Sequence, residues 1–387
     1  MLSGVRRLLA LICSIVFVDA MLFGALTPLV PDYARELDLT KTGAGLLVAA
    51  FGAGALVGGV PGGLLAARLG SRPAVIGGLI VLGVASIAFA LAGDALELGA
   101  ARFLQGFAST VTWAGALAWI AEAAPTGRRG EVIGTVFGFA VAGAVLGPLL
   151  GGVAEIVGVA SAFLAVGLVA FAFAGLAVAT ASPAPSPRAA PGGLRRALRD
   201  PRFLGGLWLN TLPAGLFGVL IVLAPLALAA AGWTTLAIAG LFFVSGLAEV
   251  VINPLLGRAT DRVGRLLPIR AALGGSIVVA VLLAGVRSGA AIAALVCAAA
   301  ITFGALYTPG MVLTSHRADA AGIAQGLAFG IMNSAWALGH MVGPGLAGIL
   351  AEPYGDELPY LAGAGLCLLT LLASFRLVPG RMGPREA

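Results

Sequence analysis

Several polar side chains lie inside long apolar stretches, where they could hold a proton or a charged ligand. Asp19 is the only charged residue in the apolar run 8–30. A charged aspartate at the centre of a bilayer costs about 2.5 to 3.5 kcal/mol on insertion scales, so such a residue usually has a function. Burial favours the protonated carboxyl group and a nearby cation favours the carboxylate. Asp19 could therefore bind a proton in one state of the protein and release it in another.

Three further ionisable residues have two interpretations each. Arg102 keeps its charge and needs a polar partner, so it either anchors its own segment or tunes Asp19. Glu249 is either a second titrating site or an inner-end residue that pairs with Arg258 or Arg262. His340, which precedes a Gly-Pro bend, is either a group that titrates near neutral pH or a histidine that only packs. The candidate residues for binding the substrate or the coupled proton are Asp19, Arg102, Glu249, Asn333 and His340. The candidates for lining a cavity are Trp113, Trp208, Asn210 and Trp336.

The composition requires that most of the chain lies in a membrane. Hydrophobic residues make up 60% of the 387 residues and charged residues 10%, whereas soluble domains have about 25% charged residues. Apolar stretches rich in Gly and Ala recur along the chain, each long enough to cross a hydrocarbon core about 30 Å thick as a helix. Twelve spans are predicted, over 8–31, 42–66, 73–93, 97–121, 131–154, 157–181, 203–229, 235–256, 268–287, 290–313, 323–350 and 358–378.

The distribution of basic residues predicts the orientation. With the N-terminus placed inside, the inner segments hold 19 of the 23 Lys and Arg residues. This asymmetry predicts a multi-pass protein of the cytoplasmic membrane with both termini in the cytoplasm. It also explains the net charge of +6 without nucleic acid, since there is no basic-aromatic groove. Two histidines and three isolated cysteines offer no metal-ligand spacing, so no metal site is expected.

The two halves of the chain resemble each other. The stretch "GLLAARLGSR" begins at Gly63 and "GRATDRVGR" begins at Gly257, 194 residues later. Likewise "GAVLGPLLGG" at Gly143 and "GHMVGPGLAG" at Gly339 are 196 residues apart. Parallel six-helix repeats with a substrate site between them are typical of alternating-access transporters. We expect a first bundle over 1–181, a cytoplasmic linker over 182–202 and a second bundle over 203–387.

The stretch that begins at Gly257 resembles the signature G-x-x-x-D-R-x-G-R of the major facilitator superfamily, and the copy that begins at Gly63 departs from it. An Asp beside an Arg at a helix end can pair with the other half in one conformational state, which makes it a latch. The first copy has Ala67 where the family usually has Asp, so its latch should be weaker; the alternative for its arginines is that they only set topology. The predicted latch residues are Gly63, Arg68, Gly70, Arg72, Gly257, Asp261, Arg262, Gly264 and Arg265.

Two further motifs resemble the same superfamily. Arg102, Gln105 and Gly106 resemble its R-x-x-Q-G motif. The Gly-Pro motifs resemble those of proton-driven exporters, in which small residues four apart allow close helix packing. We expect them to pack the seam, meaning the interface between the two halves. Their residues are Gly143, Gly147, Pro148 and Gly151 in the first half, and Gly339, Gly343 and Pro344 in the second.

The passage "VDAMLFGALTPLVPDY" resembles the first span of drug:proton antiporters, and especially of vesicular amine and acetylcholine transporters. The resemblance implies that Asp19 faces the cavity and serves cation recognition or proton coupling. Three departures limit it. Phe51 stands where those transporters have Lys, Asn333 stands where they have Asp, and the span 290–313 has no acid.

The sequence thus predicts an all-α membrane protein with twelve transmembrane helices in two pseudo-symmetric six-helix bundles. The expected function is secondary transport of a small molecule, as proton-coupled efflux of amphipathic or cationic compounds by alternating access. A metabolite or sugar transporter on the same fold is the alternative, and a membrane sensor without transport is another. We expect the protein to be a monomer that needs no cofactor and is driven by the proton gradient. We do not expect an enzyme, since no span places a nucleophile and a base at helical spacing.

Overall fold

The computed structural model describes residues 2–124, 128–181, 193–263, 266–323 and 325–376, and in these ranges it contains helices and no strand. The side chains of residues 253–265 lie outside the description, as do residues 182–192 of the expected linker. The helices are α1 (Leu2–Ala25), α2 (Val30–Glu36), α3 (Lys41–Leu69), α4 (Ser71–Leu91), α5 (Ala95–Ala123), α6 (Arg129–Val157), α7 (Val159–Ala179), α8 (Gly193–Ala197), α9 (Pro201–Ala230), α10 (Thr235–Val263), α11 (Leu266–Gly285), α12 (Gly289–Gly304), α13 (Tyr307–Ala320), α14 (Gln325–Tyr354) and α15 (Glu357–Arg376), with a short 3-10 turn at Thr27–Leu29.

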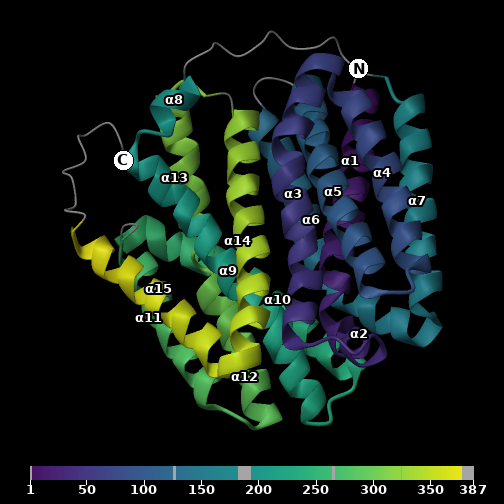
Figure 1. Ribbon diagram of the computed structural model, residues 1–387. Helices are drawn as coiled ribbons and strands as arrows, with labels where there is room; N and C mark the ends of the chain where they lie inside the picture. The colour runs from purple at the N-terminus through teal and green to yellow at the C-terminus, as the bar shows by residue number, and fades with distance from the viewer. Residues whose placement is uncertain (1, 125–127, 182–192, 264–265, 324, 377–387) are drawn as a thin grey trace.

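The predicted all-α membrane fold is confirmed. Ten segments of the described chain are long and apolar enough to cross a membrane, with α1–α2 and α12–α13 each counting as one. The helices α5 and α14, of 29 and 30 residues, run alongside them and complete the twelve (Figure 1). In Figure 1 the helices α1–α7, coloured purple to blue-teal, form one half, and the helices α9–α15, coloured teal to yellow, form the other.

The first and tenth spans differ from the unbroken helices that were expected. The first is interrupted by the 3-10 turn, where Pro28 and Pro31 remove backbone donors. The tenth is interrupted at Ala305 and Leu306, between α12 and α13. Both interruptions lie within apolar sequence, so hydropathy alone did not reveal them.

The signature stretches continue the helices instead of forming the loops that were expected after residues 66 and 256. Gly63 and Arg68 lie on the last turns of α3, and the segment 257–263 lies on α10. The Leu, Ala and Arg residues of the segment 64–69 have high helix propensity, so α3 continues through the first stretch. The turn comes at Gly70, whose φ of 102° is one that other residues rarely adopt.

The two ends of the molecule carry different segments. We call the end with α8 and the start of α1 the linker end, and the end with α2 and the turn between α14 and α15 the far end (Figure 1). The chain enters α3 at Lys41 on the far end and leaves it on the linker end. The positive-inside prediction corresponds to a cytoplasmic linker end.

The prediction that the Gly-Pro motifs pack the seam was wrong for most of their glycines. A Cβ atom on Gly143 would lie 2.2 Å from the carbonyl oxygen of Phe17, and one on Gly147 would lie 2.7 Å from that of Met21, both on α1. Gly151 likewise meets α1, at Ala25. The motif in α6 therefore packs against α1 inside the first half. Small residues specify close approach but not the helix that approaches.

The second-half motif has the equivalent role. Cβ atoms on Gly339 and Gly343 would lie 2.4 Å and 2.3 Å from the carbonyl oxygens of Thr211 and Gly215, which belong to α9. The two prolines, Pro148 and Pro344, lie within the helices α6 and α14. The glycines of the two motifs therefore pack inside their own bundles, whereas the carbonyl oxygen of Pro344 also faces Gly45 of α3 at the seam.

The seam itself is formed mainly by α3 and α14. A Cβ atom on Gly45 would lie 2.4 Å from the carbonyl oxygen of Pro344, and one on Gly52 would lie 2.5 Å from the backbone of His340. Nearer the far end, a Cβ atom on Gly348 would lie 2.2 Å from the carbonyl oxygen of Lys41. Backbone-to-backbone contact over this length holds the far-end half of the seam closed.

Candidate functional site

Asp19 is buried in the middle of the first bundle, with 3% of its surface exposed. Its Oδ2 accepts hydrogen bonds from Ser109 Oγ at 2.7 Å and from Trp113 Nε1 at 2.8 Å. Both donors come from α5, where residues four apart share a face. Oδ1 is buried and has no hydrogen-bond partner in the described part of the chain. One carboxyl oxygen is thus held and the other is available to a proton or a cation.

An aromatic cluster, consisting of Phe23, Phe51, Trp336 and His340, lies one turn from Asp19 along α1. The Phe23 ring centroid is 5.2 Å from that of Phe51 on α3, and 5.0 Å and 5.1 Å from those of Trp336 and His340 on α14. His340 is 4% exposed, and its Nδ1 lies 3.3 Å from the carbonyl oxygen of Trp336. The cluster therefore bridges the two halves across the seam.

Arg102 is buried on α5 with 1% of its surface exposed. Its guanidinium carbon lies 4.7 Å from the centroid of the Phe51 ring, and its Nη1 donates to Gln105 Oε1 at 3.1 Å. Tyr33 of α2 also interacts with it electrostatically. These surrounding groups in the described chain are a ring, an amide and a phenol, so Arg102 has no carboxylate partner here. Its expected communication with Asp19 is not a direct contact in this state.

Glu249 lies at the interruption of the tenth span. Its Oε1 is 2.5 Å from the position that a Cβ atom on Gly304 would occupy, and it interacts electrostatically with Tyr307. Tyr307 also interacts with the Trp336 side chain, which links this region to the aromatic cluster. The side chains of Arg258 and Arg262, the alternative partners of Glu249, lie outside the described residues.

The remaining candidates occupy different places. Trp113 is bonded to Asp19 and packs on Phe137 at 5.6 Å between ring centroids. Asn333 is half-buried on α14, seven residues before His340 and thus on the same helix face. Asn210 donates within α9 to Gly206 at 2.9 Å, and Trp208 is exposed and donates to Thr370 of α15 at 3.0 Å. The structure does not bring these last two to Asp19.

Among the described residues, the partners found for the expected first-half latch residues lie within the first half. Arg72 Nε donates to the carbonyl oxygen of Ala177 at 3.0 Å, and its Nη2 donates to that of Val178, so it caps the end of α7 within the first bundle. Arg68 is exposed on α3, and a Cβ atom on Gly63 would meet nothing within 4 Å. Gly264 and Arg265 lie outside the described residues, as do the side chains of Gly257, Asp261 and Arg262.

Sequence reasoning did not identify the polar contacts that join the halves at the far end. Lys41 Nζ pairs with Asp356 Oδ1 at 2.5 Å, and the backbone nitrogen of Thr42 donates to Glu352 at 3.1 Å. Thr235 Oγ1 donates to Asp32 Oδ2 at 2.6 Å. We call these residues of α2, α3, α10, α14 and the turn after it the far-end latch. Because the partners are 203 to 315 residues apart, no sequence spacing could have paired them.

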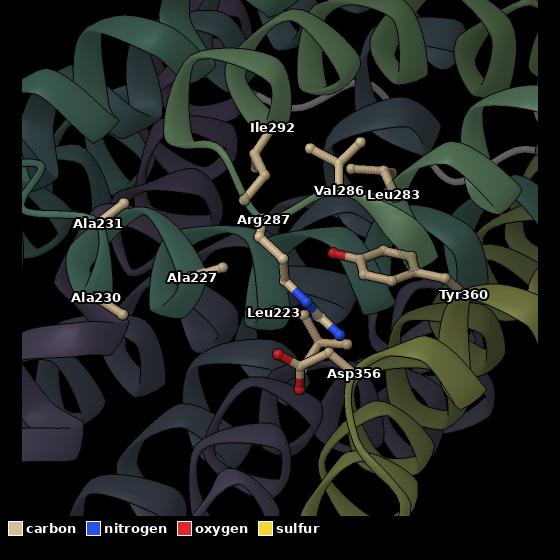
Figure 2. Close-up of a pocket in the computed structure, with 10 residues that line it drawn as sticks. All are labelled: Leu223, Ala227, Ala230, Ala231, Leu283, Val286, Arg287, Ile292, Asp356 and Tyr360. Atoms are coloured by element: carbon tan, nitrogen blue, oxygen red, sulfur yellow. The ribbon is translucent and has the colours of Figure 1, made fainter.

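A cavity of about 280 Å³ lies beside the far-end latch, inside the second bundle. Figure 2 shows that its walls are mostly apolar, with Arg287 and Asp356 as charged lining residues and Tyr360 beside them. Arg287 pairs with Glu357, and Asp356 pairs with Lys41. Asp356 therefore belongs to the far-end latch, whereas the ion pair of Arg287 lies inside the second bundle.

Residues 12–329 match the family described as the Major Facilitator Superfamily. The chain belongs to this superfamily. Its members are transporters that bind small-molecule substrates and lie in the lipid bilayer. The twelve-helix fold and the signature residues that suggested the superfamily therefore agree with the match.

Among curated relatives, Multidrug resistance protein 2 of Bacillus subtilis (strain 168) is 24% identical over 361 residues, which cover 90% of this chain and 89% of its own. The MFS-type transporter ppzB of Metarhizium rileyi is 33% identical over 161 residues, 40% of this chain and 33% of its own. Quinolone resistance protein NorA of Staphylococcus aureus (strain MRSA252) is 30% identical over 137 residues, 35% of each. The chain thus spans about a third of the length of ppzB and NorA.

Two solved structures show the same fold. A bacterial homolog to the human lysosomal transporter Spinster, in an inward-facing and occupied conformation, has a TM-score of 0.75 at 15% identity and covers 96% of both chains. The nucleoside transporter NupG has a TM-score of 0.74 at 12% identity, covering 97% of this chain and 100% of its own. At these identities the likeness concerns the fold alone.

Proposed function

We propose that this superfamily member is a proton-coupled exporter of amphipathic or cationic compounds that works by alternating access. The observation that carries the proposal is Asp19, a buried carboxyl group with one free oxygen, next to an aromatic cluster that bridges both halves. A carboxyl group in this position can exchange a proton for a cation, and aromatic faces suit an apolar or cationic body. The names of two relatives, a multidrug resistance protein and a quinolone resistance protein, support efflux.

In this proposal the protein lies in the cytoplasmic membrane with its linker end inside, and the proton gradient supplies the energy without a cofactor. A monomer suffices, because Asp19, Arg102 and the aromatic cluster all come from one chain. His340 and Asn333 contribute the α14 side of the site, and Glu249 is its second carboxylate, at the broken span. Asp261 and Arg262 remain the proposed inner latch.

Transport into inverted membrane vesicles tests this function. With a pH gradient imposed, acidic inside, vesicles that contain the protein should accumulate ethidium or tetraphenylphosphonium, and nigericin should abolish the accumulation by collapsing the gradient. Vesicles without the protein provide the control. Accumulation that persists after the collapse, or transport only of neutral sugars and nucleosides, would contradict proton-coupled export.

The far-end latch should set the balance between the two conformations. Partly exposed charged contacts contribute about 0.2 to 1 kcal/mol each, so Lys41→Met combined with Glu352→Gln, which weakens two of them, should open the far end by a factor of about 2 to 30. The measurement is labelling of Ala49→Cys, at the α3–α14 seam, by an impermeant maleimide from the far side, in a background without native cysteines. Arg287→Met, which breaks a pair inside one bundle, is the control. Equal labelling of all variants would show that the far-end latch does not affect the balance between the two conformations.

A further inference from the structure

Two buried charged groups in the first bundle each have an atom without a partner. Asp19 Oδ1 and Arg102 Nε are buried without a hydrogen bond in the described part of the chain. Leaving buried charged groups incompletely paired is costly, and no carboxylate pairs with Arg102 in the described part of the chain. The first bundle therefore contains two opposite charges, each with one hydrogen-bonding atom that has no partner in the described part of the chain.

Arg102 and the residue that binds Asp19 lie on one face of α5. Ser109, which holds Asp19, follows Arg102 by seven residues, which is two helical turns and places both on the same face. At 1.5 Å per residue the backbone positions of Arg102 and Ser109 are about 10 Å apart along the helix. In the described part of the chain Asp19 and Arg102 form no hydrogen bond or ion pair with each other.

Aromatic surface fills the distance between the charges. Phe23 is one turn from Asp19 on α1, its ring lies 5.2 Å from that of Phe51, and the Phe51 ring lies 4.7 Å from the Arg102 guanidinium carbon. The order is therefore carboxylate, two aromatic rings and guanidinium. This order complements a molecule with a cationic end, an aromatic body and an anionic end.

We infer that the site selects amphipathic zwitterions, whose ammonium group binds Asp19 and whose carboxylate binds Arg102, with an aromatic body between the two charges. The inference rests on the proposed export function and adds the substrate class to it. Arg102 presents a planar fork of donors that suits a carboxylate, and Asp19 accepts from an ammonium through its free oxygen. The ligand thus supplies the counter-charge that Arg102 lacks.

Binding of a matched set of rigid probes tests the inference without any gradient. The zwitterion is 4′-(aminomethyl)biphenyl-4-carboxylate, its methyl ester is the cation, and 4′-methylbiphenyl-4-carboxylate is the anion. Affinity is measured by calorimetry on the full-length protein in detergent. The wild type should bind the zwitterion at least tenfold more tightly than the ester, and Arg102→Met should remove this preference while still binding the ester.

Two further variants keep the result interpretable. Arg102→Lys retains the charge without the fork and should keep part of the preference. Arg270→Met removes an arginine that also stacks on a ring, that of Phe375 at 4.2 Å, but far from Asp19, and should keep all of it. Ester binding by Arg102→Met shows that the variant is folded.

Equal binding of zwitterion and ester by the wild type would overturn the inference and leave the export function intact, since that function needs only Asp19 and a cation. A preference that survives in Arg102→Met would also overturn it. If the export function itself is wrong, the vesicles that contain the protein will not accumulate substrate when the pH gradient is imposed, which is a separate measurement.

Discussion

Asp19→Asn should abolish gradient-driven accumulation of a cationic substrate and still allow the substrate to equilibrate across the membrane. Asparagine keeps the size of the side chain and can still accept from Ser109 and Trp113 through its amide oxygen. It can neither bind a proton nor carry the negative charge that attracts a cation. With one proton per substrate and a gradient of one pH unit, the accumulation ratio should fall from about ten to about one.

This prediction is checked by comparing steady-state accumulation in vesicles with the rate of downhill exchange. Asp19→Glu retains the titratable group and should retain coupling at a reduced rate. Glu249→Gln is the informative comparison at the second carboxylate. Coupling that survives in Asp19→Asn and is lost in Glu249→Gln would move the coupling site to the broken tenth span.

Gly106→Ala should destabilise the protein by about 1 to 3 kcal/mol, because helices α3 and α5 cross there with their backbones in contact. A Cβ atom on Gly106 would lie 1.9 Å from the carbonyl oxygen of Phe51, and one on Gly54 would lie 1.8 Å from that of Phe103. Both neighbours are helix backbone, so neither can move without the whole helix. Unfolding on heating, followed by size-exclusion chromatography in detergent, measures the loss.

Gly99→Ala is the control on the same helix, since a Cβ atom there would meet nothing within 4 Å. It should be neutral or slightly stabilising, because alanine favours the helix. The double variant Gly54→Ala with Gly106→Ala should cost less than the sum of the two, since both push the same pair of helices apart. Equal stability of Gly106→Ala and Gly99→Ala would contradict the close crossing.

The sequence predicted the fold well because membrane spans depend on length and apolarity, which are local properties. It also identified Asp19, since an acid in an apolar span stands out without knowledge of its neighbours. It did not predict that Ser109 donates to Asp19, and it gave Trp113 a cavity role instead of a bond to that carboxylate. Such partners come from another helix, and nothing in the spacing of α1 and α5 pairs them.

The motif predictions failed where the partner mattered. Gly147 and Gly343 permit close approach, but the sequence could not say that α1 and α9 are the helices that approach. Arg72 was taken for a latch residue, whereas it caps α7, which ends more than a hundred residues later. Phe51, seen in sequence only as a departure from relatives, proved to be the ring that stacks on Arg102.

The most direct test of the central claim is to count the protons that a cationic substrate displaces from the purified protein. Detergent-solubilised wild-type protein in weakly buffered solution with a pH indicator is titrated with tetraphenylphosphonium, and Asp19→Asn is treated in parallel. If substrate and proton compete for Asp19, the wild type should release protons when it binds tetraphenylphosphonium, and the number released should depend on pH. The Asp19→Asn variant should release none. Binding without proton release by the wild type, or equal release by the variant, would contradict proton exchange at Asp19.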